Sequence, residues 1–176
     1  MILREAGPAD AGAIAAFHNR IWHETYAALA PPEAIARLDE EHRLRQWGRA
    51  LALPPPQGTV LAGIGARIAG LVSLGPPDHP LHGARGAIGH LYVDRAARGT
   101  GLGRRLLLLA HERLAAAGFP GAALAVVRGN LAARGFYAAL GGTEAAGFAD
   151  PGPLWRSDNL LITWDFTPPG PLPSSR

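Results

Sequence analysis

Apolar residues recur along the chain at two spacings, one typical of amphipathic helices and one typical of strands, and Pro and Gly clusters separate these stretches. The helical spacing predicts helical segments within residues 9–26, 32–53, 104–117 and 130–141. Short apolar and β-branched runs predict strands over residues 2–6, 59–64, 67–74, 87–93, 122–127, 143–148 and 160–166. The triple proline at 54–56 separates the N-terminal helical region from the strands that follow.

This order of elements is typical of α/β proteins, because helices alternate with strands through the second half of the chain. We expect a mixed central sheet of about six to seven strands with helices on both faces. The length of 176 residues suits one domain, which we place at residues 1–167. Residues 168–176 are rich in Pro, Gly and Ser, and we expect them to form a disordered tail.

A glycine-rich run, Arg98-Gly99-Thr100-Gly101-Leu102-Gly103, stands between a predicted strand and a predicted helix. Glycines let backbone N–H groups approach a ligand, and the first N–H groups of a helix attract anions, so this arrangement predicts a phosphate site. The run is not a P-loop, because the chain contains no Lys to follow its glycines. It also departs from the dinucleotide fingerprint, whose third Gly would fall at Arg104. A glycine-rich turn without a ligand is the remaining alternative.

A second motif lies downstream, where Asn130 begins the pattern N-x-x-A-x-x-F-Y that ends at Tyr137 and is followed by Leu140-Gly141-Gly142. Together, the R-G-x-G-x-G run and this pattern resemble the GNAT superfamily of N-acetyltransferases. The resemblance covers roughly residues 2–166, is strongest over 88–142, and implies the GNAT fold. It also implies that the loop amides hold the pyrophosphate of acetyl-CoA, the co-substrate. The expected coenzyme-binding residues are Leu91, Tyr92, Val93, Arg98, Gly99, Thr100, Gly101, Leu102, Gly103, Arg104, Asn130 and Tyr137.

The resemblance also suggests catalytic residues. The family tyrosine that matches Tyr137 points at the coenzyme A sulfur, so Tyr137 is the candidate general acid, with core packing as the alternative role. Strand alternation places His90 on one face with Ile88 and Tyr92, and His90 is the candidate base, with an ordinary pKa near 6.5. A histidine that is merely hydrogen-bonded beside the sheet is the alternative. Glu24 and Glu144 are rival bases; Glu24 belongs to a segment that matches the family's acceptor pocket.

We therefore expect an enzyme that moves an acetyl group from acetyl-CoA to a primary amine by direct transfer in a ternary complex. The acceptor is a small-molecule amine or a peptide N-terminus. A module that binds acyl-CoA without turnover is a second hypothesis, and a structural αβ domain with a vacant loop is a third. A homodimer is compatible with the resemblance, because dimers are common in the family.

Composition and charge exclude several other classes. The net charge of +3 comes with scattered arginines and no basic run longer than two, which argues against nucleic-acid binding. The chain has no Cys, and His79 and His82 lie in a Pro-rich loop without further close ligands, so we expect no metal site. No apolar run approaches the length of a membrane span and no signal-peptide pattern precedes the first strand, so we expect a cytoplasmic protein without membrane partners.

Overall fold

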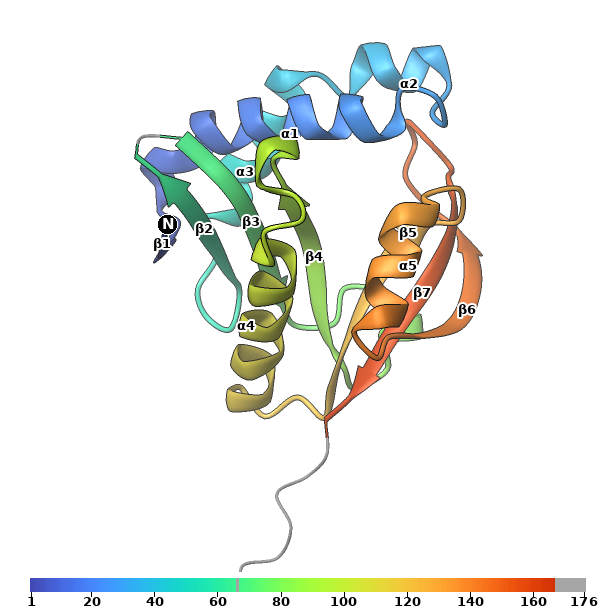
Figure 1. The fold of residues 1–176 in the computed structure, drawn as a ribbon. Helices are drawn as coiled ribbons and strands as arrows, with labels where there is room; N and C mark the ends of the chain where they lie inside the picture. The colour runs from blue at the N-terminus through green and yellow to red at the C-terminus, as the bar shows by residue number, and fades with distance from the viewer. Residues whose placement is uncertain (66, 167–176) are drawn as a thin grey trace, which may run out of the picture.

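A computed structural model of the chain describes residues 1–65 and 67–166 (Figure 1). Its centre is a seven-stranded sheet in the order β1-β2-β3-β4-β5-β7-β6, which confirms the predicted mixed sheet. The strands are β1 (Ile2–Glu5), β2 (Gly58–Ile64), β3 (Arg67–Gly75), β4 (Gly86–Val93), β5 (Gly121–Val127), β6 (Thr143–Ala149) and β7 (Asp158–Asp165). The expected end of the domain at 167 and the expected disordered tail at 168–176 lie outside the described residues.

Five α-helices accompany the sheet in the part of the chain that the structure describes. They are α1 (Ala11–Tyr26), α2 (Pro32–Arg37), α3 (Glu40–Ala50), α4 (Leu102–Ala116) and α5 (Leu131–Ala139). The region 32–53 forms two separate helices, because the Asp39 carboxylate accepts a hydrogen bond from the His42 backbone N–H at 2.8 Å and starts α3 anew. Helix α4 begins two residues earlier than the pattern predicted, directly after Gly101.

Alternate residues of the central strands bury opposite faces of the sheet. Val60 of β2 and Val72 of β3 pack in the same cluster as the apolar stripe of α4, whereas Leu61 and Leu71 pack with α1 and α3. The predicted stripe of α4 is buried at Leu102, Leu106, Ala110 and Leu114. The sheet is therefore covered by helices on both faces, as predicted.

Strands β4 and β5, the single parallel pair of the described sheet, pair only near their N-terminal ends and then diverge. Register pairs join Gly86 to Ala122 and Ala87 to Ala123, and none joins the rest of the two strands. Figure 1 shows β4 and β5 close together at their lower ends and far apart at their upper ends. This divergence opens the centre of the sheet at the point where β4 leads into the glycine-rich run.

Candidate active site

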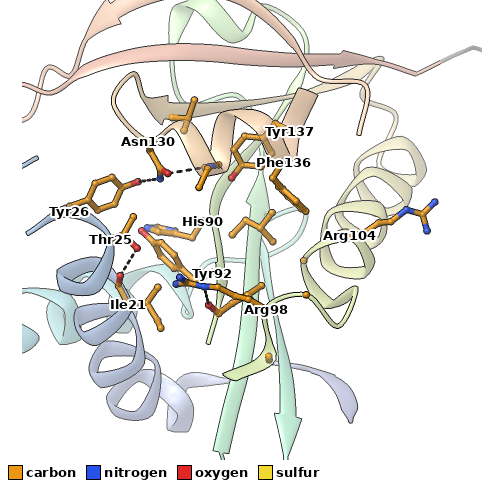
Figure 2. Close-up of a pocket in the computed structure, with 18 of the residues that line it drawn as sticks. Ile21, Thr25, Tyr26, His90, Tyr92, Arg98, Arg104, Asn130, Phe136 and Tyr137 are labelled. Atoms are coloured by element: carbon orange, nitrogen blue, oxygen red, sulfur yellow. Dashed lines mark hydrogen bonds between the residues drawn. The ribbon is translucent and has the colours of Figure 1, made fainter. Parts of the chain in front are cut away.

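A cavity of about 640 Å³ lies in the opening between β4 and β5 (Figure 2). Residues 89–93 of β4 form one wall, and Ala125 and Val126 of β5 form another. The C-terminal half of α1 contributes Ile21, Thr25 and Tyr26, and α5 contributes Phe136 and Tyr137. The glycine-rich run closes the end of the cavity nearest α4.

The glycine-rich run has the backbone that an anion site needs. Gly99 and Gly101 have φ values of 76° and 85°, in the left-handed region that side chains disfavour. Gly101 is the N-cap of α4, whose first hydrogen bond runs from Arg105 N to the Gly101 carbonyl at 3.0 Å. The amides of the first helical turn therefore have no partner within the helix and carry partial positive charge. A Cβ on Gly103 would lie 3.2 Å from the Phe136 ring, so this position also favours glycine.

The polar side chains of the run have different surroundings. Arg98 lines the cavity and donates through Nε to the Val93 carbonyl at 3.2 Å. Arg104 also lines the cavity, but in Figure 2 its guanidinium extends away from the centre of the site. The Thr100 hydroxyl donates to the Ala97 carbonyl at 2.7 Å, and the Leu102 side chain is buried in the core, so neither side chain faces the cavity. These two residues can contribute only backbone groups to a ligand.

A buried carboxylate, Asp94, ties the segment between β4 and the glycine-rich run to α1. Its Oδ1 accepts from the Ala96 backbone N–H at 2.9 Å, and its Oδ2 accepts from Arg20 Nη2 at 2.8 Å. These hydrogen bonds hold the pKa of Asp94 below its usual value, the backbone bond most of all. Arg20 also pairs with Glu24 at 3.1 Å.

Neither rival base lines the cavity. Glu24 is engaged with Arg20 on the outer side of α1, and Glu144 of β6 forms an exposed ion pair with Arg134 at 2.7 Å. Glu24 was a rival base because its segment, residues 22–26, matches the family's acceptor pocket. In the structure, its neighbours Ile21 and Thr25 occupy the cavity wall instead, because one helix face can point inward at a time.

Tyr137 is brought into the cavity by α5. Asn130 starts this helix by accepting from the Ala133 backbone N–H at 3.2 Å, and it also donates to the Tyr26 hydroxyl at 3.4 Å (Figure 2). The Tyr137 ring is buried, and its hydroxyl has no hydrogen-bond partner among the described residues. Burial raises the pKa of Tyr137, so the phenol stays protonated at neutral pH.

His90 lies across the cavity from α5, on the face of β4 that packs against α1 and α3. The register of β3 and β4 places Ser73 beside it, and the Ser73 Oγ lies 2.9 Å from His90 Nδ1. The ring also packs against His18 and Trp47, at centroid distances of 5.0 and 4.8 Å. Burial, aided by the charge of Arg43, lowers the pKa of His90 from its ordinary value near 6.5 to about 4.

The structure adds residues to those predicted from the sequence. Tyr26 of α1 lines the cavity together with Tyr92 of β4 and Tyr137 of α5, both of which were predicted. Ser73 reaches His90 only because β3 and β4 pair in one particular register. Residues of this kind become visible only when the topology is known.

Within residues 1–65 and 67–166, no three His, Asp or Glu side chains come together in a way that could hold a metal ion. His79 packs on Phe148, with 4.6 Å between ring centroids, and His82 Nδ1 lies 3.2 Å from the Asp78 carboxylate. None of the helices in the described residues is long and apolar enough to span a membrane.

The cavity thus joins a glycine-rich helix start, whose free amides suit an anion, to a protonated tyrosine and a neutral histidine. The family model described as the acetyltransferase (GNAT) family matches residues 18–141. The chain therefore belongs to the GNAT family of acetyltransferases.

Solved structures of this fold cover nearly the whole chain. The Thermoplasma acidophilum PaiA N-acetyltransferase in complex with coenzyme A is 19% identical, with a TM-score of 0.72 over 94% of this chain and 98% of that one. The Salmonella typhimurium YncA, a putative acetyltransferase with its cofactor acetyl-CoA, is 20% identical, with a TM-score of 0.68 over 99% of each chain. The Brucella melitensis ribosomal-protein-alanine N-acetyltransferase is 22% identical, with a TM-score of 0.71 over 94% of this chain and 100% of that one. A comparison with curated proteins returned no match.

Proposed function

We propose that this protein is an N-acetyltransferase that moves the acetyl group of acetyl-CoA directly to a primary amine within a ternary complex. The observation that carries the proposal is the placement of His90 and Tyr137 in one cavity that ends at the glycine-rich run. Two of the structural neighbours contain acetyl-CoA or coenzyme A, as their descriptions state. The acceptor is a small-molecule amine or a peptide N-terminus, and the use of acetyl-CoA makes a cytoplasmic enzyme the natural expectation.

The coenzyme is held mainly by backbone groups. The unpaired amides at the start of α4 face the pyrophosphate, and Arg98 supplies positive charge at the cavity wall. The thioester end extends along residues 89–93 of β4 toward Tyr137. Holding both reactants in this way contributes on the order of 7–11 kcal/mol to lowering the barrier, so binding is itself part of catalysis.

The acid–base roles follow from the protonation states of the two residues. The amine attacks the thioester carbonyl as a free base, and His90, which is neutral at pH 7, accepts its proton at Nε2. This role requires the tautomer in which Nδ1–H donates to Ser73 Oγ. The C–S bond then breaks, and the Tyr137 hydroxyl donates its proton to the departing thiolate.

The test is a thiol-release assay with acetyl-CoA and a panel of acceptors: simple alkylamines, polyamines, amino acids, aminoglycosides and peptides with a free N-terminus. Calorimetry with coenzyme A, run in parallel, separates binding from turnover. Thiol release that requires both the amine and the protein, with a mass increase of one acetyl group on the amine, supports the proposal. Coenzyme A binding without thiol release for any amine favours the acyl-CoA sensor, and the absence of coenzyme A binding contradicts both.

A further inference from the structure

Arg43, on α3, is a buried cation without a carboxylate partner among the described residues. The residue is only 6% exposed, and its Nε is fully covered and makes no hydrogen bond. Nη1 donates to Gln46 Oε1 at 3.1 Å, and the guanidinium carbon lies 5.5 Å from the centre of the Trp22 ring. A buried guanidinium that contacts only a neutral amide and an aromatic ring destabilises the fold unless an anion compensates its charge.

The neighbours of Arg43 connect it to the candidate active site. Trp22, below the guanidinium, packs on Tyr26 with 5.6 Å between ring centroids, and Tyr26 lines the main cavity. The charge of Arg43 acts on both His90 and Tyr92, whose side chains line the same cavity. Arg43 therefore lies on the α1 and α3 side of the sheet, across from the face on which α4 begins.

A second, smaller cavity of about 180 Å³ reaches Gln46, the hydrogen-bond partner of Arg43, whereas Arg43 itself lines neither of the two cavities. The smaller cavity is bounded by Gln46 and Trp47 of α3 and by Ser73 of β3, and it shares Gly89 and His90 with the main cavity. His90 thus stands between the two cavities. The Gln46 side chain, which lines the smaller cavity, is also the group that now occupies Arg43 Nη1.

We propose that Arg43 recognises a carboxylate on the acceptor, so that the amine acetylated by this enzyme belongs to an amino-acid-like molecule. The inference rests on the proposed function, because it assigns the substrate class of the same site. The carboxylate replaces Gln46 Oε1 on the guanidinium, whose planar fork matches a carboxylate with two parallel hydrogen bonds. The amine of the same molecule then lies on the His90 side, close to the thioester.

The surroundings of Arg43 favour a carboxylate over a phosphate or phosphonate. The titratable groups that face it are His18 from α1, His42 on its own helix, and His90 and Tyr92 from β4. The pKa values of all three histidines are lowered, chiefly by burial, so these rings are neutral at pH 7. One guanidinium balances a single negative charge, and no second cation of the described residues acts on the pKa of Arg43.

The experiment compares matched acceptors on the intact protein. Glycine, leucine, phenylalanine and 4-aminobutyrate are each assayed with acetyl-CoA beside the corresponding carboxamide, which keeps the amine and removes the charge. Aminomethylphosphonate tests the alternative oxyanion. The variants are Arg43→Met, which keeps volume without charge, and Arg43→Lys, which keeps charge without the fork; a surface variant, Arg45→Met, is the matched control on the same helix.

We expect wild-type kcat/KM to be higher for at least one amino acid than for its amide, and Arg43→Met to raise KM for that amino acid roughly 10- to 100-fold. The carboxamide should be affected little, Arg45→Met should behave as wild type, and Arg43→Lys should recover part of the preference. Arg43→Met should also melt no lower than wild type, because it removes an unpaired buried charge.

A purely structural Arg43 predicts a different pattern, in which Arg43→Met lowers the melting temperature and impairs acids and amides equally. That pattern, or a wild-type enzyme that does not prefer acids to amides, overturns the proposal while leaving the acetyltransferase function intact. A preference for aminomethylphosphonate over glycine overturns the choice of carboxylate. If no amine releases thiol, the proposed function fails, but the role of Arg43 can still be tested by calorimetry of the same amino acids on the protein loaded with coenzyme A. Binding that is lost in Arg43→Met supports the role of Arg43. The absence of binding to the wild type refutes it.

Discussion

The candidate base is expected to keep working at acidity where an ordinary histidine would be protonated. Burial and the charge of Arg43 lower the pKa of His90 from 6.5 to about 4. The difference corresponds to about 3 kcal/mol in favour of the neutral ring. A base must be unprotonated to accept the proton of the amine, so kcat/KM should fall as the pH drops through about 4, and not through 6.5.

The two alternatives are easily separated at pH 5.5. A base with a pKa of about 4 is still about 97% unprotonated at this pH, whereas a base with a pKa of about 6.5 is only about 9% unprotonated. The predicted difference in kcat/KM between the two cases is therefore about tenfold. This difference is far larger than the error of a steady-state assay.

The assay measures kcat/KM between pH 4 and 8 with a thiol reagent that reacts in acid, such as 4,4′-dithiodipyridine. Two amines of different pKa are compared, because a limb caused by the amine moves with the amine and a limb caused by the enzyme does not. His90→Gln should lose the acidic limb and most of the activity. Ser73→Ala, which removes the partner of His90 Nδ1, should lower kcat while coenzyme A affinity is retained.

Protein stability needs its own control, since low pH also protonates other buried groups. Circular dichroism at each pH, with activity measured after return to neutral pH, separates unfolding from loss of the base. An acidic limb near 6.5 in the wild type would refute the pKa argument. A limb near 4 that persists in His90→Gln would show that another group is the base.

Three further predictions concern the acid, the glycine-rich run and stability in acid. Tyr137→Phe should leave coenzyme A affinity unchanged in calorimetry and lower kcat by 10²–10⁴-fold, as for loss of a general acid; wild-type kcat would assign Tyr137 to packing. Gly101→Asp and Gly103→Asp should abolish coenzyme A binding, because each adds a negative charge at the phosphate site. Gly101 also has a φ of 85°, and a Cβ at Gly103 would lie 3.2 Å from the Phe136 ring. Gly48→Ala, at an open position of α3, is the control and should bind coenzyme A normally. His111, whose pKa is lowered to about 4 by burial against Trp164, binds fewer protons in the folded than in the unfolded state between pH 6.5 and 4, so the free energy of unfolding falls as the pH drops across this range. His111→Leu should therefore reduce the loss of unfolding free energy between neutral and acid pH by up to about 3 kcal/mol, less any solvent screening. Urea titrations at pH 7 and 4.5 measure this loss, and an equal loss in both proteins would contradict the prediction.

Local sequence signals predicted the parts of the molecule whose geometry is local. The glycines at 99 and 101, the cap at Asn130 and the apolar stripe of α4 each act within a few residues, and the structure places all of them as expected. Strand alternation placed His90 and Tyr92 on one face of β4, where both rings pack against His18. The prediction that Ile88 shares this face was wrong: Ile88 packs in the α4 cluster, because the pairing of β3 with β4 shifts register between Ser73 and Leu74.

The parts that escaped prediction depend on contacts between distant segments. Arg43 lies in a highly charged helix and looks like a residue of a solvated face, yet the packing of α3 on α1 buries it. Asp94 and Arg20 are 74 residues apart and meet only because α1 crosses the end of β4. The pKa of His90 depends on this same packing, which is why an ordinary value near 6.5 was the natural expectation from sequence.

The short pairing of β4 with β5 has a structural consequence. Two register pairs join these strands, whereas seven join β5 to β7. The sheet therefore consists of two parts, β1–β4 and β5–β7, that are joined only at a narrow seam between β4 and β5. Alternate backbone groups of residues 89–93 bond to β3, and the others face the seam without a strand partner. A ligand that hydrogen-bonds to those groups would extend the pairing of β4 beyond Ala87 and would join the two parts of the sheet where β5 no longer does.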